Sequence, residues 1–317
     1  MSKDAYRDFC KKQAQLPLFF QDWWLDACSD NGQWGVAVAR NSANDVIAAL
    51  PYLLKRKYKI SVVTQPVLTP WLGVFFADGV SLKENNRKLV LEELIAALPK
   101  YHRYNQCWHY SFENWMPLHW LGFKQTTRYT YVINGLKDID SVWGSLKKST
   151  RSDIKKATER YKLRIADEPS FERFWNLHTK VFSRQGLKAP YRRSLVERID
   201  KECALRECRK IVLAVDENGV DQAAVYMVWD AQCAYYLMAG SDPQFRHTAA
   251  NTYCLWESLK HASLLVDSFD FEGSMIEPVA KYMESFGGSR IGYHYISRTS
   301  SRVFSLLSAI RAGINVR

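Results

Sequence analysis

Two carboxylates near the end of the chain have the spacing of a proton-transfer pair. Asp270 and Glu272 alternate with Phe269 and Phe271 in a run predicted to be a strand. Because successive side chains of a strand point to opposite faces, both carboxylates should share one face. Burial would raise the pKa of one acid, which could then accept a proton from an attacking ammonium group. The alternative is a structural pair, satisfied by backbone N–H groups or by an arginine.

Two phenols lie on the predicted strand before the carboxylates. Tyr235 and Tyr236 are consecutive, so one of them must face inward. That phenol could donate a hydrogen bond to a leaving group, or it could simply pack; both interpretations stay open. His178 and His247 lack a metal-ligand partner at useful spacing, and the seven cysteines show no zinc-type pairs. We therefore expect no metal site and reduced structural thiols.

The positive charge is concentrated in two segments. Of a net charge of +11, Lys147–Arg164 carries +6 and Ser285–Arg317 carries +5. Such a surface favours a polyanion, either a phosphate-bearing substrate, RNA or an anionic membrane face, with a solvated helix face as an equal alternative. In the first segment, Arg151, Lys155 and Lys156 could clamp phosphates.

The first basic segment is predicted to be helical, from Asp138 to Tyr161 with a break near Ser149–Thr150. Basic and polar positions four apart would form one exposed column, consisting of Lys148, Ser152, Lys156 and Arg160. Ile154, Ala157 and Tyr161 form an apolar stripe that can dock on a core.

One order of elements occurs twice in the chain. Each copy has a hairpin, a helix, a strand ending in Phe-Glu, a short helix, a glycine stop and a last strand. The matching segments are Val36–Pro51 with Val212–Met227, Arg87–Leu98 with Thr252–Leu265, and Asn105–Glu113 with Ser268–Glu272. This pattern predicts an internally duplicated α/β (α+β) fold with two units, 1–135 and 136–317, each a mixed sheet covered by helices.

The element order resembles the GNAT acyltransferase fold, and the duplication is similar to the Fem-type peptidyltransferases and their GNAT-like relatives. The residues that carry the resemblance are Phe269–Ser274 with Ser285–Gly288 and Tyr293, Trp143–Arg151 with Ile154–Ala157, and Phe182–Lys188. The resemblance covers most of the chain. Two features depart from it. The long coiled-coil arm of some Fem-type enzymes is absent, and the GNAT phosphate loop is altered to Gln244–Asn251, without its first glycine.

The resemblance implies an N-acyltransferase that moves an acyl or aminoacyl group to an amine, on a cell-envelope precursor or a small molecule. The donor would be acyl-CoA or aminoacyl-tRNA, and tRNA or a lipid-linked phosphate are the expected partners. The expected catalytic residues are Asp270, Glu272 and Tyr236; the substrate ligands are Arg151, Lys155, Lys156 and Arg184; the donor ligands are Gln244, Arg246, His247 and Asn251. The alternative is a non-catalytic polyanion-binding protein on a GNAT scaffold.

The two units should differ in role. Ser111 stands in the first copy where Asp270 stands in the second, so we expect the first unit to support substrate binding and the second to hold the donor. The first residues, Met1–Asp8, lack the apolar core of a signal peptide, and Ile60–Ala77 is too polar and proline-broken for a membrane span. We expect a cytoplasmic protein, with attachment to the inner face of the membrane as an alternative.

Overall fold

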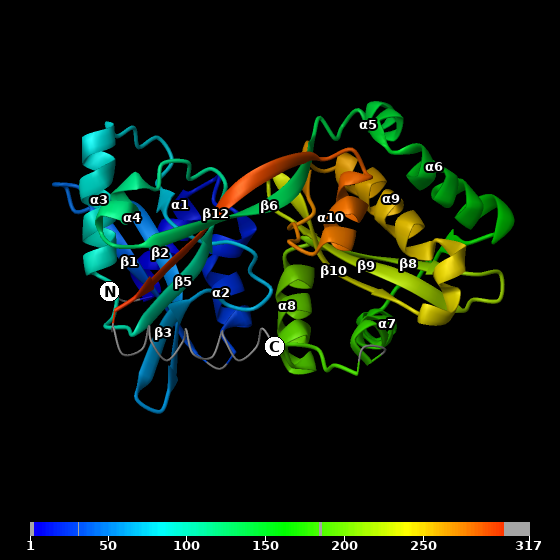
Figure 1. Cartoon of the computed structure of the whole chain (residues 1–317), viewed down its shortest axis with the longest axis horizontal. Helices are drawn as coiled ribbons and strands as arrows, with labels where there is room; N and C mark the ends of the chain where they lie inside the picture. Colours follow the sequence, from blue (N-terminus) through cyan, green and yellow to red (C-terminus); the bar gives the residue numbers. More distant parts are fainter. Residues whose placement is uncertain (1–2, 31, 184–185, 301–317) are drawn as a thin grey trace. The chain divides into compact units, whose positions relative to one another are not determined.

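The computed structural model describes residues 3–30, 32–183 and 186–300. Packing divides them into two compact units. The division falls inside two strands of the chain, near Arg128 and near Gly292. Unit 1 contains the residues up to Arg128 together with those from Gly292 onward, and unit 2 contains Tyr129–Ile291 (Figure 1).

Unit 1 is built on an antiparallel hairpin to which further strands are added. Its elements are α1 (Lys3–Lys12), η1 (Leu18–Phe20), α2 (Asp22–Cys28), β1 (Gln33–Arg40), β2 (Val46–Lys57), β3 (Ile60–Thr64), β4 (Phe75–Phe76), α3 (Glu84–Ala96), β5 (Arg103–Trp108), α4 (Met116–Trp120), the start of β6 (Lys124–Asn134) and most of β12 (Ser289–Thr299). Strands β1, β2, β3 and β5 are neighbours in that order, and β4 pairs with β2.

Alternation along the hairpin gives unit 1 a core on each face of its sheet. Val36 packs with the aromatic and aliphatic side chains of α1 and α2, whereas Ala37, the next residue, packs with those of α3 and α4. Period-two geometry explains why helices are needed on both faces.

Unit 2 also has a mixed sheet covered by helices, with a short strand at its edge. Its elements are the rest of β6, α5 (Ile139–Ser145), α6 (Lys148–Lys155), the π-helical turn η2 (Lys156–Arg160), β7 (Arg164–Ile165), α7 (Phe171–Ser183), α8 (Arg193–Leu205), β8 (Arg209–Val215), β9 (Asp221–Trp229), β10 (Cys233–Ser241), η3 (Pro243–Thr248), α9 (Ala250–Ser263), β11 (Ser268–Asp270), α10 (Glu277–Glu284) and the start of β12. Helices α7 and α8 lie on one face of β8–β10, and α9 and α10 lie on the other (Figure 1).

The last strand of each predicted copy pairs within the unit of the other copy. In unit 1, β12 runs antiparallel to β5, with His294 opposite Trp108. In unit 2, β6 runs antiparallel to β11, with Val132 opposite Asp270. The packing units therefore differ from the predicted division into 1–135 and 136–317, because each half donates its final strand. That the two halves are copies of one repeat stays a prediction.

Several predicted element ends are wrong. Strand β5 ends at Trp108 and β11 at Asp270, so both Phe-Glu pairs follow their strands instead of closing them. The helix break falls at Leu146–Lys147 and not near Ser149–Thr150, because Arg151 turns back onto the end of α5 and donates to Gly144 O at 2.8 Å and Leu146 O at 2.7 Å. The predicted apolar stripe is confirmed, since Ile154 and Ala157 are in the unit 2 core.

Candidate functional site

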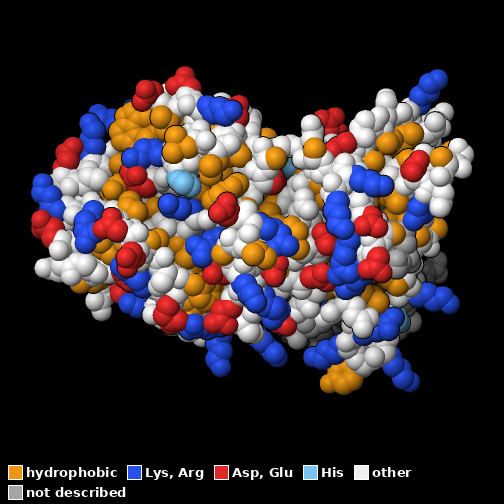
Figure 2. All heavy atoms as spheres, turned by 180° about the vertical axis from the view of Figure 1, so that it is seen from behind, with side chains coloured by type: hydrophobic (Ala, Val, Ile, Leu, Met, Phe, Trp, Pro, Cys, Tyr) orange, Lys and Arg blue, Asp and Glu red, His pale blue; other side chains and the backbone are white. Residues whose placement is uncertain are grey.

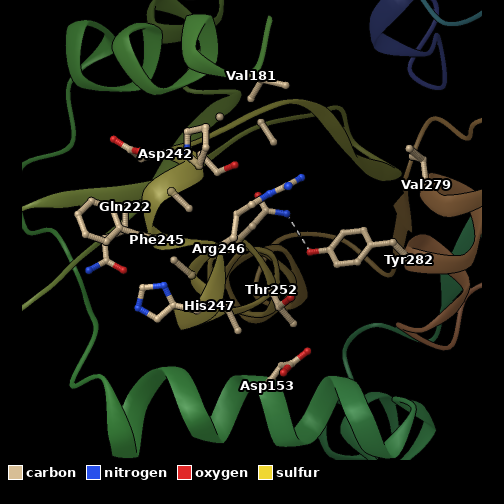
Figure 3. A pocket seen from close by; sticks show the side chains of 18 of the residues that line it. Asp153, Val181, Gln222, Asp242, Phe245, Arg246, His247, Thr252, Val279 and Tyr282 are labelled. Atoms are coloured by element: carbon tan, nitrogen blue, oxygen red, sulfur yellow. Dashed lines mark hydrogen bonds between the residues drawn. The ribbon is translucent and has the colours of Figure 1, made fainter. Parts of the chain in front are cut away.

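A cleft of about 560 Å³ opens in unit 2 where β10 ends and α9 begins (Figure 3). The residues that line it come from β9, β10, the η3 loop, α7, α9, α10 and the α6–η2 helix that faces them. The lining residues used below are Asp153, Lys156, Val181, Gln222, Tyr236, Ala239, Gly240, Asp242, Arg246, His247, Ala249, Ala250, Asn251, Thr252 and Tyr282.

The amino end of α9 forms one wall of this cleft. Ala249 precedes the helix in the left-handed conformation (φ 60°, ψ 24°) and supplies no side-chain cap. The first backbone N–H groups of a helix have no intrahelical partner and carry partial positive charge, so they can hold an anion. An alanine in this conformation costs about 1 kcal/mol. The altered loop thus positions the helix start without the glycine of the family pattern.

Polar contacts fix the loop that leads into α9. The Asp242 carboxylate accepts from Gln244 N at 2.9 Å and pairs with Lys180 Nζ at 2.5 Å. The Lys180 ammonium group lowers the pKa of Asp242, so this ion pair persists at neutral pH. Thr248 Oγ1 donates to Gln222 Oε1 at 2.8 Å beneath the loop. The loop is therefore tied to α7 and β9 before any ligand binds.

Basic side chains come from both sides of the cleft. Arg246 and His247 come from the loop, and Lys156 comes from the π-helical turn that faces it. The Tyr161 ring lies 5.8 Å from Lys156 Nζ and 5.3 Å from the His247 ring, so it joins the two sides. Asp153 and Asp242 also line the cleft, and Asp242 is neutralised by Lys180. A phosphate group fits this charge pattern.

A cluster of neutral hydrogen-bonding groups lines the wall beside α10. Burial raises the pKa of Tyr236 to about 12, so its phenol keeps its proton at neutral pH. Burial also raises the pKa of Tyr282 above its usual range. Asn251 Nδ2 donates to Tyr282 Oη at 3.0 Å (Figure 3). Tyr236 can therefore donate a hydrogen bond to a ligand atom in the cleft.

The two predicted catalytic acids do not line this cleft. Asp270 is fully buried, and its Oδ1 accepts from Thr130 Oγ1 at 2.5 Å and from Glu272 N at 2.7 Å. That second bond closes a turn two residues on, and Glu272 has φ 58°. The expected strand alternation therefore ends at Asp270, and the prediction that both acids share one strand face is wrong. Burial, then the nearby charge of Asp270, raises the pKa of Glu272.

The predicted substrate and donor residues separate into three groups. Lys156, Arg246, His247, Asn251 and Tyr236 line the cleft together. Arg151 instead holds the end of α5, and Gln244 and Lys155 are exposed residues outside the lining. Arg184 lies outside the described residues. Lys155 and Lys156 are adjacent, so helix position alone decides which one reaches the cleft.

Sequence reasoning missed Tyr282 and Gln222 as lining residues. Tyr282 lies on a predicted short helix with no distinguishing signal, and its partner Asn251 is distant in sequence. Gln222 is a buried amide at the start of a strand of small apolar residues. A buried amide needs a hydrogen-bond partner, and a polar residue in such a strand is the sequence signal that could have indicated a site.

The part of the chain that the structure describes contains no three His, Cys, Asp or Glu side chains grouped so that they could hold a metal ion. No described helix combines the length and apolar character needed to cross a membrane.

Comparison with known proteins gives the fold. Residues 144–275 match the family model described as an acetyltransferase (GNAT) domain. The structure is similar to that of FemX, with 15% identity over 93% of this chain and 96% of that one, at a TM-score of 0.66. It is also similar to a C-terminal domain of a putative lysylphosphatidylglycerol synthetase from Agrobacterium fabrum, with 9% identity over 99% and 97% of the two chains, at a TM-score of 0.58.

A third similar structure is a tandem GNAT protein from the clavulanic acid biosynthesis pathway. It has 10% identity over 94% of this chain and 95% of that one, at a TM-score of 0.53. A search of curated proteins found no match to the sequence. The predicted mixed α/β architecture and its resemblance to Fem-type and GNAT proteins are confirmed.

Proposed function

We propose that this chain, which has a Fem-like GNAT fold, transfers an acyl or aminoacyl group from a phosphate-bearing donor to an amine. The observation that carries the proposal is the unit 2 cleft, where the start of α9, Lys156, Arg246 and His247 surround one end and neutral phenols the other. The cleft lies largely within the residues that match the GNAT domain model. The cationic end would hold the donor phosphates, and the phenol end would receive the acyl group.

Acyl transfer to an amine needs no covalent enzyme intermediate. The amine nitrogen attacks the carbonyl carbon of the donor, a C–N bond forms, and the bond to the leaving sulfur or oxygen breaks. Tyr236 is protonated and lines the cleft, so we assign it the proton that the leaving group takes up. Asp270 already accepts two hydrogen bonds in the core, which favours a structural role.

The donor is either an acyl-CoA or an aminoacyl-tRNA, because both join a phosphate-bearing group to a reactive carbonyl. One similar structure is named as a tandem GNAT protein without AcCoA, and another as a domain of a putative lysylphosphatidylglycerol synthetase. The acceptor would be an amine on a cell-envelope precursor, on a lipid-linked phosphate, or on a small molecule.

A thermal-shift series tests the donor. Acetyl-CoA, palmitoyl-CoA and an aminoacyl-tRNA are added in turn, and only a compound that binds the folded state raises the unfolding temperature. Lys156→Ala should weaken the active donor by roughly 0.5–1.5 kcal/mol, about threefold to tenfold, whereas Lys155→Ala should not. No shift with any donor, or equal effects of the two variants, would contradict the proposed site.

The non-catalytic alternative rests on a separate observation. Lys148, Lys155 and Arg160 are exposed and do not line the cleft, so they remain available to a polyanion. On the face shown in Figure 2, basic and acidic side chains of the described residues are interspersed and form no broad basic area. Binding through phosphates alone would fall steeply with salt and show no turnover. Saturable acyl transfer would exclude this alternative.

A further inference from the structure

A histidine and a tyrosine form a hydrogen-bonded pair on the α7 face of the unit 2 sheet. His178 lies in α7 and is 4% exposed. Its Nδ1 is 2.7 Å from Ala239 O, and its Nε2 is 2.8 Å from Tyr191 Oη. Tyr191 is only partly buried, whereas His178 is enclosed by the core.

These contacts determine where the protons are. A carbonyl oxygen can only accept, so Nδ1 of His178 carries the hydrogen and Nε2 is the acceptor. Tyr191 must then donate its hydroxyl proton to Nε2, which leaves the lone pairs of the phenol oxygen able to accept a hydrogen bond. Burial lowers the pKa of His178, so the imidazole is neutral at pH 7 and its Nε2 lone pair is free to accept the hydrogen of the Tyr191 hydroxyl.

The pair adjoins the proposed donor cleft through β10. Ala239, which accepts from His178, is itself a lining residue, as are Gly240 and Val181. A Cβ on Gly240 would lie 2.4 Å from His178 N, so only glycine lets α7 approach the strand this closely. Glycine at this position therefore keeps the imidazole within hydrogen-bonding reach of the strand that lines the cleft.

Among the described residues, one charged group acts on the pair. Glu272, which follows β11, is close enough to Tyr191 for its charge to act with burial in raising the pKa of that phenol. Within the described residues, the Oε1 of Glu272 is buried and has no hydrogen-bond partner. The other rings around His178 are those of Phe174, Trp175 and Phe182. Tyr191 therefore keeps its proton until an acceptor removes it.

We propose that Tyr191 and His178 accept the proton of the attacking amine. The amine would give its proton to the Tyr191 oxygen while the hydroxyl proton of Tyr191 passes to His178 Nε2, whose Nδ1–H remains bonded to Ala239 O. The products of this step are an imidazolium, the new amide and the leaving group, which carries the proton of Tyr236. The imidazolium proton then passes back through Tyr191 to solvent, and solvent reprotonates Tyr236. This inference rests on the proposed acyl transfer. Tyr191 would touch the amine, and His178 is a positioning residue that acts through it.

The first test needs no substrate. ¹⁵N-histidine NMR of the full chain should show one imidazole, absent in His178→Gln, in the Nδ1–H form with a titration midpoint below 6.5. Tyr191→Phe should shift its Nε2 resonance, whereas Tyr101→Phe, a matched buried phenol in unit 1, should not. An Nε2–H tautomer, or no response to Tyr191→Phe, would overturn the proposed pair.

The second test measures transfer from acetyl-CoA, palmitoyl-CoA or an aminoacyl-tRNA to a mixture of small amines. Tyr191→Phe should lower kcat by ~10²-fold or more with little change in the donor KM. His178→Gln keeps an acceptor for the phenol but cannot be protonated, so the acid limb of its pH profile should disappear. Transfer that neither variant affects would overturn the relay alone, whereas no transfer by the wild type would overturn the proposed function.

Discussion

Units 1 and 2 each have a pocket at the same place in the order of elements, and the two pockets differ at the start of one helix. The pocket of unit 1 lies between β4, the start of α3 and the segment that follows β5; that of unit 2 lies between β10, the start of α9 and α10. Their volumes are about 290 and 560 Å³. In unit 1 the helix begins with Glu84, and in unit 2 with Ala250.

The difference shows two uses of the same helix end. The Glu84 carboxylate sits in the first turn of α3, where the helix dipole stabilises negative charge, and Asn114 Nδ2 donates to it at 2.8 Å. Unit 1 therefore supplies its own anion. In unit 2 the residues at the helix start are small and uncharged, and Lys156, Arg246 and His247 surround them. The start of α3 therefore stabilises its own helix, whereas the start of α9 can bind an anion from a ligand.

The largest effect should come from the phenol that lines only the larger pocket. Tyr236→Phe removes the proton for the leaving group and should lower kcat by ~10²–10⁴-fold, with donor affinity nearly unchanged. Tyr253→Phe is a matched control, because burial also raises the pKa of Tyr253 to about 12 but it does not line the cleft. Steady-state kinetics decide; equal losses in the two variants would mean that packing, not proton donation, explains the effect.

Placing an acid at the start of α9 should make unit 2 resemble unit 1. Asn251→Asp preserves shape, and the added charge should repel donor phosphates and weaken binding by ~10²-fold, since like charges placed close together cost several kcal/mol. Glu84→Gln should leave donor affinity unchanged. Calorimetric titration with the donor identified by thermal shift measures both. If Glu84→Gln alters affinity instead, the donor sits in unit 1 and the assignment is reversed.

Asp270 has no acidic counterpart in the first copy, and its substitution should act on stability. Asp270→Asn removes a buried charged acceptor from Thr130 Oγ1 and Glu272 N, so the free energy of unfolding should fall by ~1–3 kcal/mol in urea titrations. Glu113→Gln, on an exposed residue of unit 1, should change it little. A large loss of turnover at unchanged stability would instead support the catalytic role predicted from the sequence.

The smallest effect concerns Glu272 and depends on pH. Its pKa is raised in the folded state, so above the ordinary value of 4.5 the folded chain binds more protons than the unfolded one. Stability should therefore decrease as pH rises from 4.5 through the folded pKa. Glu272→Gln should remove this slope, gaining relative stability at pH 8 and none at pH 4 in denaturant titrations. Parallel curves for both proteins would show that the carboxyl is solvated.

The order of elements was predictable because hydrophobic periodicity and turn residues are local properties. The basic part of the site was predictable too, since Arg246 and His247 are adjacent in a loop before a helix. The pairing of β6 with β11 was not predictable. The residue patterns of β6 and β12 are similar, and neither pattern indicates which partner strand each one takes. Likewise, the left-handed backbone at Glu272 depends on a hydrogen bond from its own N–H to Asp270, which no residue pattern records.

The pairing of β12 with β5 has a consequence for biosynthesis. Residues 103–108 remain without this partner strand until residues 294–299 have been made. Domains normally fold in order as the chain leaves the ribosome, amino-terminal first. Here the sheet of unit 1 is completed only after residues 294–299 have been made, so a chain that stalls before them would expose an unpaired strand edge, which is prone to aggregation. The sheet of unit 1 can therefore be completed only after unit 2 has been synthesised.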